Sequence, residues 1–227
     1  MPVFAHILGV DEVIDVVIPV RDVDQWLDEA ISSVLTQEGV DVSVTVVDAG
    51  SKRPITLSGA IDDDPRVLLV RSEEPLVAGA ARNLGVSRGS AELLGFLDAD
   101  DLWPPQRCRE LVEAFASAQV DLVIGRVEEF GSREGLVPGP AHLAGGVLIR
   151  RATYEAIGGQ NSTLATGEWV DFMARARHEG LQELETNVLA LRRRIHGAST
   201  TVARRDLRKE YLKVVRAQLA RRENPDG

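Results

Sequence analysis

The sequence has one cysteine, no long hydrophobic run and no glycine-rich phosphate-binding motif, and each shortage narrows what the protein can be. Because Cys108 is the only cysteine among the 227 residues, no intramolecular disulfide can form, and we interpret it as a small packing residue. No apolar run approaches the roughly 20 residues that a membrane-spanning helix requires. The first six residues lack a basic segment followed by an apolar one, so we expect no signal peptide and a cytoplasmic location.

Two common nucleotide-binding signatures are missing as well. Neither Gly-x-Gly-x-x-Gly nor Gly-x-x-x-x-Gly-Lys-Ser/Thr follows any run that is predicted to be a strand. The first signature is typical of dinucleotide-dependent dehydrogenases, and the second of nucleoside triphosphatases with a phosphate-binding loop. Their absence disfavours both classes of enzyme.

Charge is divided unevenly along the chain, whose net charge is −9. Residues 1–191 hold 15 Lys and Arg against 31 Asp and Glu, whereas residues 192–222 hold 11 against 2. The acidic body should repel nucleic acid, so we expect no nucleic-acid partner. The basic stretch has apolar residues at helical spacing from about 203 to 222. We therefore expect a domain over 1–200 and a C-terminal helical tail over 201–227, which is either a solvated helix or a weak contact to an anionic membrane surface.

The apolar pattern predicts an α/β domain. Aliphatic runs predict strands at 14–20, 42–47, 66–71, 93–97, 121–125 and 147–149. Apolar residues at helical spacing predict helices at 24–35, 77–87, 105–118, 152–157 and 167–179. Alternation of strands and helices indicates a sheet with parallel pairing and helices on its faces. Residues 131–146 are rich in glycine and proline. We interpret them as a loop that covers a binding site, on the side where a second substrate (the acceptor) would enter or as a lid, or as a plain surface connection.

One stretch carries most of the chemistry. The apolar residues 93–97 lead directly into Asp98-Ala99-Asp100-Asp101. Ligands of open α/β sheets bind at the carboxyl ends of the strands, and hard cations such as Mg²⁺ or Mn²⁺ prefer carboxylate oxygens. Three acids within four positions repel one another unless a cation lies among them. The stretch therefore predicts a divalent-cation and diphosphate site, with an acidic turn that caps the next helix as the alternative.

Five motifs follow one another along the chain in a fixed order. They are Pro19-Val20-Arg21, Asp48-Ala49-Gly50-Ser51, Ala81-Arg82-Asn83-Leu84-Gly85, Asp98-Ala99-Asp100-Asp101 and Gly167-Glu168-Trp169-Val170-Asp171. Each motif alone is weakly specific, but the ordered set over roughly residues 13–200 resembles the motif series of glycosyltransferase family 2. The resemblance implies the GT-A fold, a Rossmann-like and mostly parallel central sheet flanked by helices.

The resemblance also assigns a nucleotide-sugar site. It implies that backbone groups of Pro19, Val20 and Arg21 hold the nucleotide base and that Asp48 reads it. This chain has Ala49 where the family usually has a second acid, which leaves the preference for uridine open. The remaining residues implied to lie beside the nucleotide sugar are Arg82, Asn83, Asp98 and Ala99, with Asp98 approaching the ribose.

Metal and catalytic roles follow from the same resemblance. Asp100 is expected to bind the cation, Mn²⁺ or Mg²⁺, together with His196, which follows Arg192-Arg193-Arg194 where relatives bring a metal-binding histidine. The general base should be a carboxylate that faces the acceptor hydroxyl. We expect Glu168 in this role, with Asp171 as the second choice on the same helix face, although acids also favour helix N-termini for electrostatic reasons.

The sequence as a whole predicts a metal-dependent, inverting glycosyltransferase that moves a sugar from a nucleoside diphosphate sugar, with UDP-sugar expected, to an unknown acceptor. Two alternatives stay open. One is a catalytically impaired domain that only binds a nucleotide sugar, because Ala49 and Trp169 stand where relatives carry acids. The other is a sugar nucleotidyltransferase, although the glycine-rich loop that those enzymes usually have after the first strand is absent. A homodimer is also left open.

Overall fold

The computed structural model describes residues 13–115, 120–132, 134–136 and 143–196. Its strands are β1 (Val13–Val20), β2 (Asp41–Asp48), β3 (Val67–Arg71), β4 (Leu93–Phe96), β5 (Leu122–Gly131), β6 (Gly135–Leu136), β7 (Val147–Arg150) and β8 (Glu183–Ile195). Its helices are α1 (Leu27–Leu35), α2 (Gly59–Asp62), α3 (Ala78–Val86), α4 (Arg107–Phe115), α5 (Arg151–Ala156) and α6 (Glu168–His178), with a short 3₁₀ helix η1 (Ala144–Gly146). The predicted tail over 201–227 lies outside the described residues.

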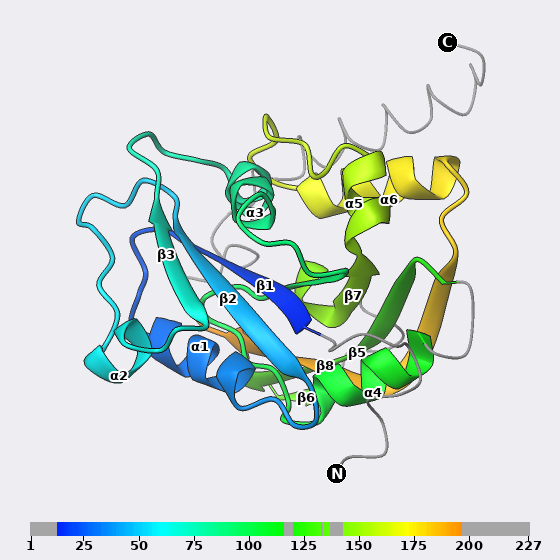
Figure 1. Ribbon diagram of the computed structural model, residues 1–227, viewed down its shortest axis with the longest axis horizontal. Coiled ribbons are helices and arrows are strands. Elements are labelled where there is room, and N and C mark those ends of the chain that lie inside the picture. The colour runs from blue at the N-terminus through cyan, green and yellow to red at the C-terminus, as the bar shows by residue number, and fades with distance from the viewer. Residues whose placement is uncertain (1–12, 116–119, 133, 137–142, 197–227) are drawn as a thin grey trace.

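A single mixed sheet divides the described part of the chain into two helical layers (Figure 1). Its strand order is β3-β2-β1-β4-β7-β5-β6, and β8 pairs with β5. Helices α1, α2 and α4 cover one face, and α3, α5 and α6 cover the other. Side chains of successive strand residues point to opposite faces, so Val16 and Ile18 pack with the first layer while Val17 packs with the second. The predicted GT-A architecture is confirmed.

The half of the sheet formed by the parallel strands β1 to β4 contains the point at which a ligand is expected to bind. Strands β1, β2 and β3 run side by side in chain order, and β4 then returns to the free side of β1. The chain therefore changes direction across the sheet between β1 and β4, and ligands of open α/β sheets bind at such a point. Pairing between β1 and β4 stops at Val17 and Phe96, so both strand exits diverge at this carboxyl edge.

Two close approaches bring other segments of the chain against this half. A β-carbon on Gly85 of α3 would stand 2.3 Å from Val17 of β1, so only glycine lets the helix lie so near the strand. A β-carbon on Gly95 of β4 would stand 2.5 Å from the indole of Trp103. Trp103 is 3% exposed, so it packs in the core and anchors the segment that follows the acidic motif.

Strand β8 is the main feature that the sequence pattern did not predict. It runs parallel to β5 for most of its length, and its register shifts twice between Ile124 and Val127. The extra residues form a bulge that crosses Gly125, where a β-carbon would stand 2.3 Å from that of Ala190. Beyond the bulge, residues 192–196 lie beside the exit of β4, and Leu102 pairs with Arg192 through two backbone hydrogen bonds of 2.9 Å.

The other predicted elements are largely confirmed. Within the described residues, the predicted strands and helices are present with bounds that move by a few residues, and α2 is an additional short helix. The strand predicted at 121–125 continues to Gly131, so the expected loop over 131–146 begins later and contains β6 and η1. None of the described helices has the length and apolar character needed to cross a membrane.

Candidate active site at the carboxyl edge of the sheet

The aspartates after β4 each bind a different partner. Asp98 accepts a hydrogen bond of 2.6 Å from the Arg82 guanidinium, and Asp100 lies 2.8 Å from Nε2 of His196. Asp101 accepts the backbone N–H of Arg194 at 2.8 Å. The repulsion expected among these acids is therefore relieved in part by the guanidinium of Arg82 and by a backbone donor.

Asp101 differs from its neighbours in its environment. It is buried, whereas the carboxylate of Asp98 is 53% exposed and that of Asp100 is 32% exposed. Burial raises the pKa of Asp101 to about 8, and the charges of Asp98 and Asp100 add to this effect. Asp101 is therefore largely neutral at pH 7 and fixes the loop, while the two exposed carboxylates remain available to a ligand.

Arg82 joins the acidic motif to the proposed catalytic helix. Its side chain is 5% exposed and donates to Asp98 at 2.6 Å, to Glu168 at 2.8 Å and to Gln160 at 3.1 Å. Burying a guanidinium is costly unless it is paired, and two carboxylates supply the pairing. The ion pairs bring together an acid from the β4 exit, a cation from α3 and an acid from the first turn of α6.

The backbone around Glu168 has little room to move. A β-carbon on Gly79 of α3 would lie 2.8 Å from the carbonyl oxygen of Asn161, and within 3.3 Å of the β-carbons of Gln160 and Glu168. Helix α6 begins after Gly167, whose left-handed φ of 80° suits glycine. Glu168 is therefore held at the helix start beside Gln160, with 13% of its side chain exposed.

Unpartnered polar atoms gather at this cluster. Among the described residues, the buried side-chain atoms without a protein hydrogen-bond partner are Nε of Arg82, Nε2 of Gln160 and Nε1 of Trp169. All three atoms are hydrogen-bond donors. Arg82 binds Glu168, Gln160 binds Arg82, and Trp169 follows Glu168 in the chain. Buried polar groups are normally paired, so their concentration here is typical of a functional site.

Asn83 and Asp171 make structural contacts in this arrangement. The Asn83 amide donates to the carbonyl of Gln160 at 2.7 Å and accepts from the Tyr154 hydroxyl at 2.6 Å. Asp171 is buried and accepts a hydrogen bond of 2.9 Å from Arg175, which also donates to two backbone carbonyls of the loop before Gln160. Both residues thus shape the loop that positions Gln160, and Glu168 is the better placed of the two proposed bases.

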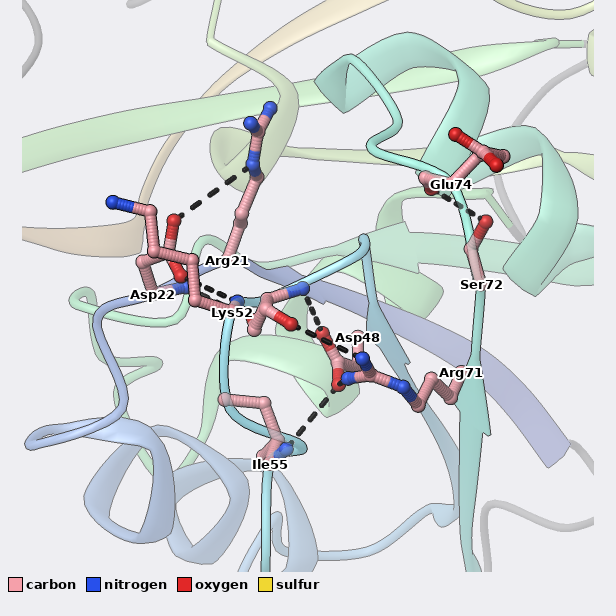
Figure 2. A network of polar contacts seen from close by, with 9 residues as sticks. Arg21, Asp22, Asp48, Lys52, Ile55, Arg71, Ser72 and Glu74 are labelled. Carbon is pink, nitrogen blue, oxygen red and sulfur yellow. Dashed lines mark hydrogen bonds and ion pairs between the residues drawn. The ribbon is translucent and has the colours of Figure 1, made fainter.

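Asp48 lies at the exit of β2 and holds the turn that follows it (Figure 2). Its carboxylate is 1% exposed and accepts from the backbone of Ser51 at 2.8 Å, from the backbone of Ile55 at 3.2 Å and from Arg71. Burial raises the pKa of Asp48, but these hydrogen bonds outweigh it and leave the pKa below its usual value. Because its oxygens are engaged inside the protein, recognition of a base by Asp48 stays a prediction.

The exits of β1 and β2 are tied together at the same edge. The backbone N–H of Asp22 donates to the Ser51 hydroxyl at 3.0 Å, and its carboxylate accepts the backbone N–H of Lys52 at 2.8 Å (Figure 2). Asp22 adopts a left-handed φ of 60°, which aspartate tolerates better than most residues. The neighbouring Arg21 is exposed, Val20 is buried, and Pro19 and Ala99 are half-buried.

Comparison of the sequence with known protein families shows which family the chain belongs to. The profile described as Glycosyl transferase family 2 matches residues 15–167, which is more than half of the chain. The chain belongs to glycosyl transferase family 2. The motifs after β1, β2 and β4 and the arginine motif of α3 all fall inside the matched range, which ends just before Glu168.

Relatives of this family-2 chain include biosynthetic proteins of bacteria. It is 30% identical to glycosyltransferase GlyA of Streptococcus pneumoniae over 132 residues, which cover 56% of this chain and 18% of GlyA. It is 27% identical to the succinoglycan biosynthesis protein ExoU of Rhizobium meliloti over 194 residues, or 73% of this chain and 57% of ExoU. The chain thus spans only part of the length of these relatives.

Solved structures of similar fold include S. aureus TarS. Residues 1–349 of TarS in complex with UDP-GlcNAc match with a TM-score of 0.76 at 14% identity, over 90% of this chain and 65% of that one. The complex of the same TarS fragment with UDP matches with a TM-score of 0.71. At this level of identity the match shows a shared fold.

The Asp100–His196 pair fits two adjacent ligands of a divalent cation. Ligands about 2.1 Å from an octahedral ion lie about 3 Å apart, and the two atoms here are 2.8 Å apart. Within the described residues, no group of three or more His, Cys, Asp or Glu side chains is arranged to hold a metal. A cation at this pair would need oxygen atoms from elsewhere, and such ions commonly take them from substrate phosphates and water.

Sequence reasoning gave no functional role to Trp26, and it considered Arg194 only as one member of the arginine triplet before His196. The Trp26 ring lies with its centroid 4.3 Å from that of His196, and Arg194 donates to the backbone carbonyl of Asp100 at 3.0 Å. Arg194 also pairs with Glu29 of α1 at 2.6 Å. Arg194 lies in β8 and His196 follows the end of that strand, so their spacing of two residues is the one signal in the sequence that links them.

Proposed function

We propose that this family-2 protein transfers a sugar from a nucleoside diphosphate sugar to an acceptor hydroxyl, with UDP-sugars as the first donors to test. The observation that carries the proposal is the ion-paired cluster of Asp98, Arg82 and Glu168, which stands beside the Asp100–His196 pair. Its place between β1 and β4 is where α/β sheets bind nucleotides. The TarS complexes with UDP and UDP-GlcNAc give a reason to begin with uridine.

The exposed carboxylates suit the diphosphate end of the donor. Asp98 would accept hydrogen bonds from a ribose, and Asp100 and His196 are the residues that would hold Mn²⁺ or Mg²⁺. When bound, the cation would neutralise negative charge that develops on the departing diphosphate. Arg82 is always charged and keeps Asp98 and Glu168 at fixed positions on either side of its guanidinium.

Glu168 is the proposed general base. In a direct displacement its carboxylate takes the proton from the acceptor hydroxyl as the oxygen bonds to the anomeric carbon, and the bond from that carbon to the diphosphate breaks. One displacement inverts the configuration of the sugar. Partial burial shields Glu168 from water, and the Arg82 ion pair orients it toward the same edge as Asp98.

The test measures release of UDP from a panel of UDP-sugars in the presence of Mn²⁺, with water in place of the acceptor. We expect turnover of at least one donor, and a loss of about 100-fold in kcat for Glu168→Gln with little change in UDP affinity, because the base is lost. The substitution also removes one charged partner of Arg82, so the melting temperature is measured and only folded protein is compared. The matched control is Asp171→Asn, which should lower the melting temperature through loss of the Arg175 pair and retain more activity per folded molecule.

One result would contradict the transferase assignment, and another would contradict only the choice of base. Binding of UDP-sugars without turnover of any donor would favour a domain that only binds nucleotide sugars. Equal kcat for Glu168→Gln and the wild type would remove Glu168 as the base while leaving the transferase assignment intact.

A further inference from the structure

The imidazole of His196 is held by more than its contact with Asp100. Pairing of β8 with β5 ends at Ile195, so the backbone ladder does not fix the residue that follows. The ring nevertheless contacts the Asp100 carboxylate at 2.8 Å and the indole of Trp26, whose centroid lies 4.3 Å away with the planes tilted by 47°.

Trp26 is itself well anchored. It forms the N-cap of α1, and its carbonyl accepts the backbone N–H of Ala30 at 3.0 Å. The next residue, Leu27, is buried in the core, which fixes the start of the helix. The indole is half-buried, so one part of it packs while another borders solvent.

Arg194 completes the support from the other side. Its guanidinium carbon lies 5.4 Å from the Trp26 ring centroid and 4.5 Å from that of Phe130. Its nitrogens also bind Glu29 and the backbone carbonyl of Asp100. The same arginine therefore fixes the indole and the backbone of the aspartate that faces His196.

We infer that Trp26 is a positioning residue for a divalent-cation site formed by Asp100 and His196, and that its indole face orients the imidazole so that both side chains point at one ion. The inference rests on the cation-binding part of the proposed function. Residues that orient metal ligands contribute strongly to affinity because the ligands are then ordered before the ion arrives.

The indole also supplies the means of testing the inference. Mn²⁺ is paramagnetic and quenches the fluorescence of a nearby fluorophore. Mg²⁺ is diamagnetic and does not. The chain has three tryptophans, and the other two, Trp103 and Trp169, are buried at 3% and 6% exposure. We expect Mn²⁺, added alone and with UDP, to quench the fluorescence of Trp26, and Mg²⁺ to reverse the quenching by competition.

The affinity for Mn²⁺ is measured separately from the electron paramagnetic resonance signal of the free ion. Trp26→Ala should weaken Mn²⁺ binding about tenfold. Trp26→Phe keeps an aromatic face and should bind within about twofold of the wild type, yet lose the quenching. Trp169→Phe is the matched control and should keep both. Melting temperatures identify any variant that has lost its fold, and only folded variants are compared.

Wild-type affinity in Trp26→Ala would overturn the inference, as would a Trp26→Phe variant as weak as Trp26→Ala. Failure of the cation site itself is recognised in the wild type, which would then bind no Mn²⁺ with or without UDP. Asp100→Ala should abolish both the quenching and the tight binding, and retention of both would place the ion elsewhere.

Discussion

Arg82 is the residue on which the candidate site is centred. Its guanidinium is buried, and it bonds to carboxylates that come from opposite ends of the proposed site, Asp98 and Glu168. Loss of either acid would leave a buried positive charge with one partner, which is expensive. The same side chain therefore serves the fold, by joining α3 to α6, and the chemistry, by fixing the positions of both acids.

The ionised carboxylate of Asp48 is expected to stabilise the folded protein, and this contribution should be lost in acid. Its pKa lies below the usual value in the folded protein, so its contribution is fully present above about pH 4 and is lost as the pH falls through the lowered pKa. Asp48→Asn keeps the size of the side chain but weakens the hydrogen bonds from Ser51, Ile55 and Arg71. We expect it to lower the free energy of unfolding by roughly 1–3 kcal/mol at pH 7.

The measurement is urea unfolding of both proteins between pH 7 and pH 3. The difference between wild type and Asp48→Asn should shrink toward the acid end, because the wild type loses the ionised form on which the contacts depend. A difference that stays constant over this range would show that the charge of Asp48 does not stabilise the turn.

Individual residues were predictable to the extent that a local motif defined them. The aspartates after β4, Arg82 and Glu168 all follow from short sequence motifs, and the structure brings them together. The contact between Trp26 and His196 was not predictable, since it joins residues far apart in the sequence through β8. The structural contacts of Asn83 were hidden for the same reason, because its partners are on α5 and the following loop.

At the scale of elements, β8 connects the fold to the candidate site. Its bulge over Gly125 lets the strand leave its first register and deliver residues 192–196 to the acidic loop. The sequence patterns that worked best were the apolar runs of the buried strands. The same pattern did not predict strand β8, because this strand is partly exposed, carries many charges and is interrupted by the bulge.

Gly125→Ala tests this role of the bulge. A β-carbon there would stand 2.3 Å from that of Ala190 and 2.7 Å from the carbonyl oxygen of Val188, so the backbone of β8 must move. We expect a loss of roughly 1–3 kcal/mol in the free energy of unfolding, measured by urea denaturation. Because the end of β8 would shift as well, the affinity for Mn²⁺ should also fall.

The control for this substitution is Gly59→Ala in α2, where a β-carbon would meet nothing within 4 Å. Alanine is favoured over glycine in a helix, so this variant should be neutral or stabilised by up to about 1 kcal/mol. If Gly125→Ala behaved like Gly59→Ala, the close crossing of β8 over Gly125 would not constrain the strand.

At the scale of the whole molecule, the two halves of the sheet play different parts. The parallel strands β1, β2 and β4 present their exits at one edge. Strands β5 and β8 run in the same direction beyond the antiparallel β7, and the end of β8 brings Arg194 and His196 to the acidic loop at that edge. The overall α/β architecture followed from the alternation of strands and helices. The mixed second half did not, because antiparallel pairing of β7 depends on contacts between distant segments.

The most direct test of the account is a crystal structure of the protein with UDP and Mn²⁺. We predict that the nucleotide lies between the exits of β1 and β4 and that the ion is bound by Asp100, His196 and oxygens of the diphosphate. A nucleotide bound at another part of the molecule, or an ion that contacts neither Asp100 nor His196, would contradict the account.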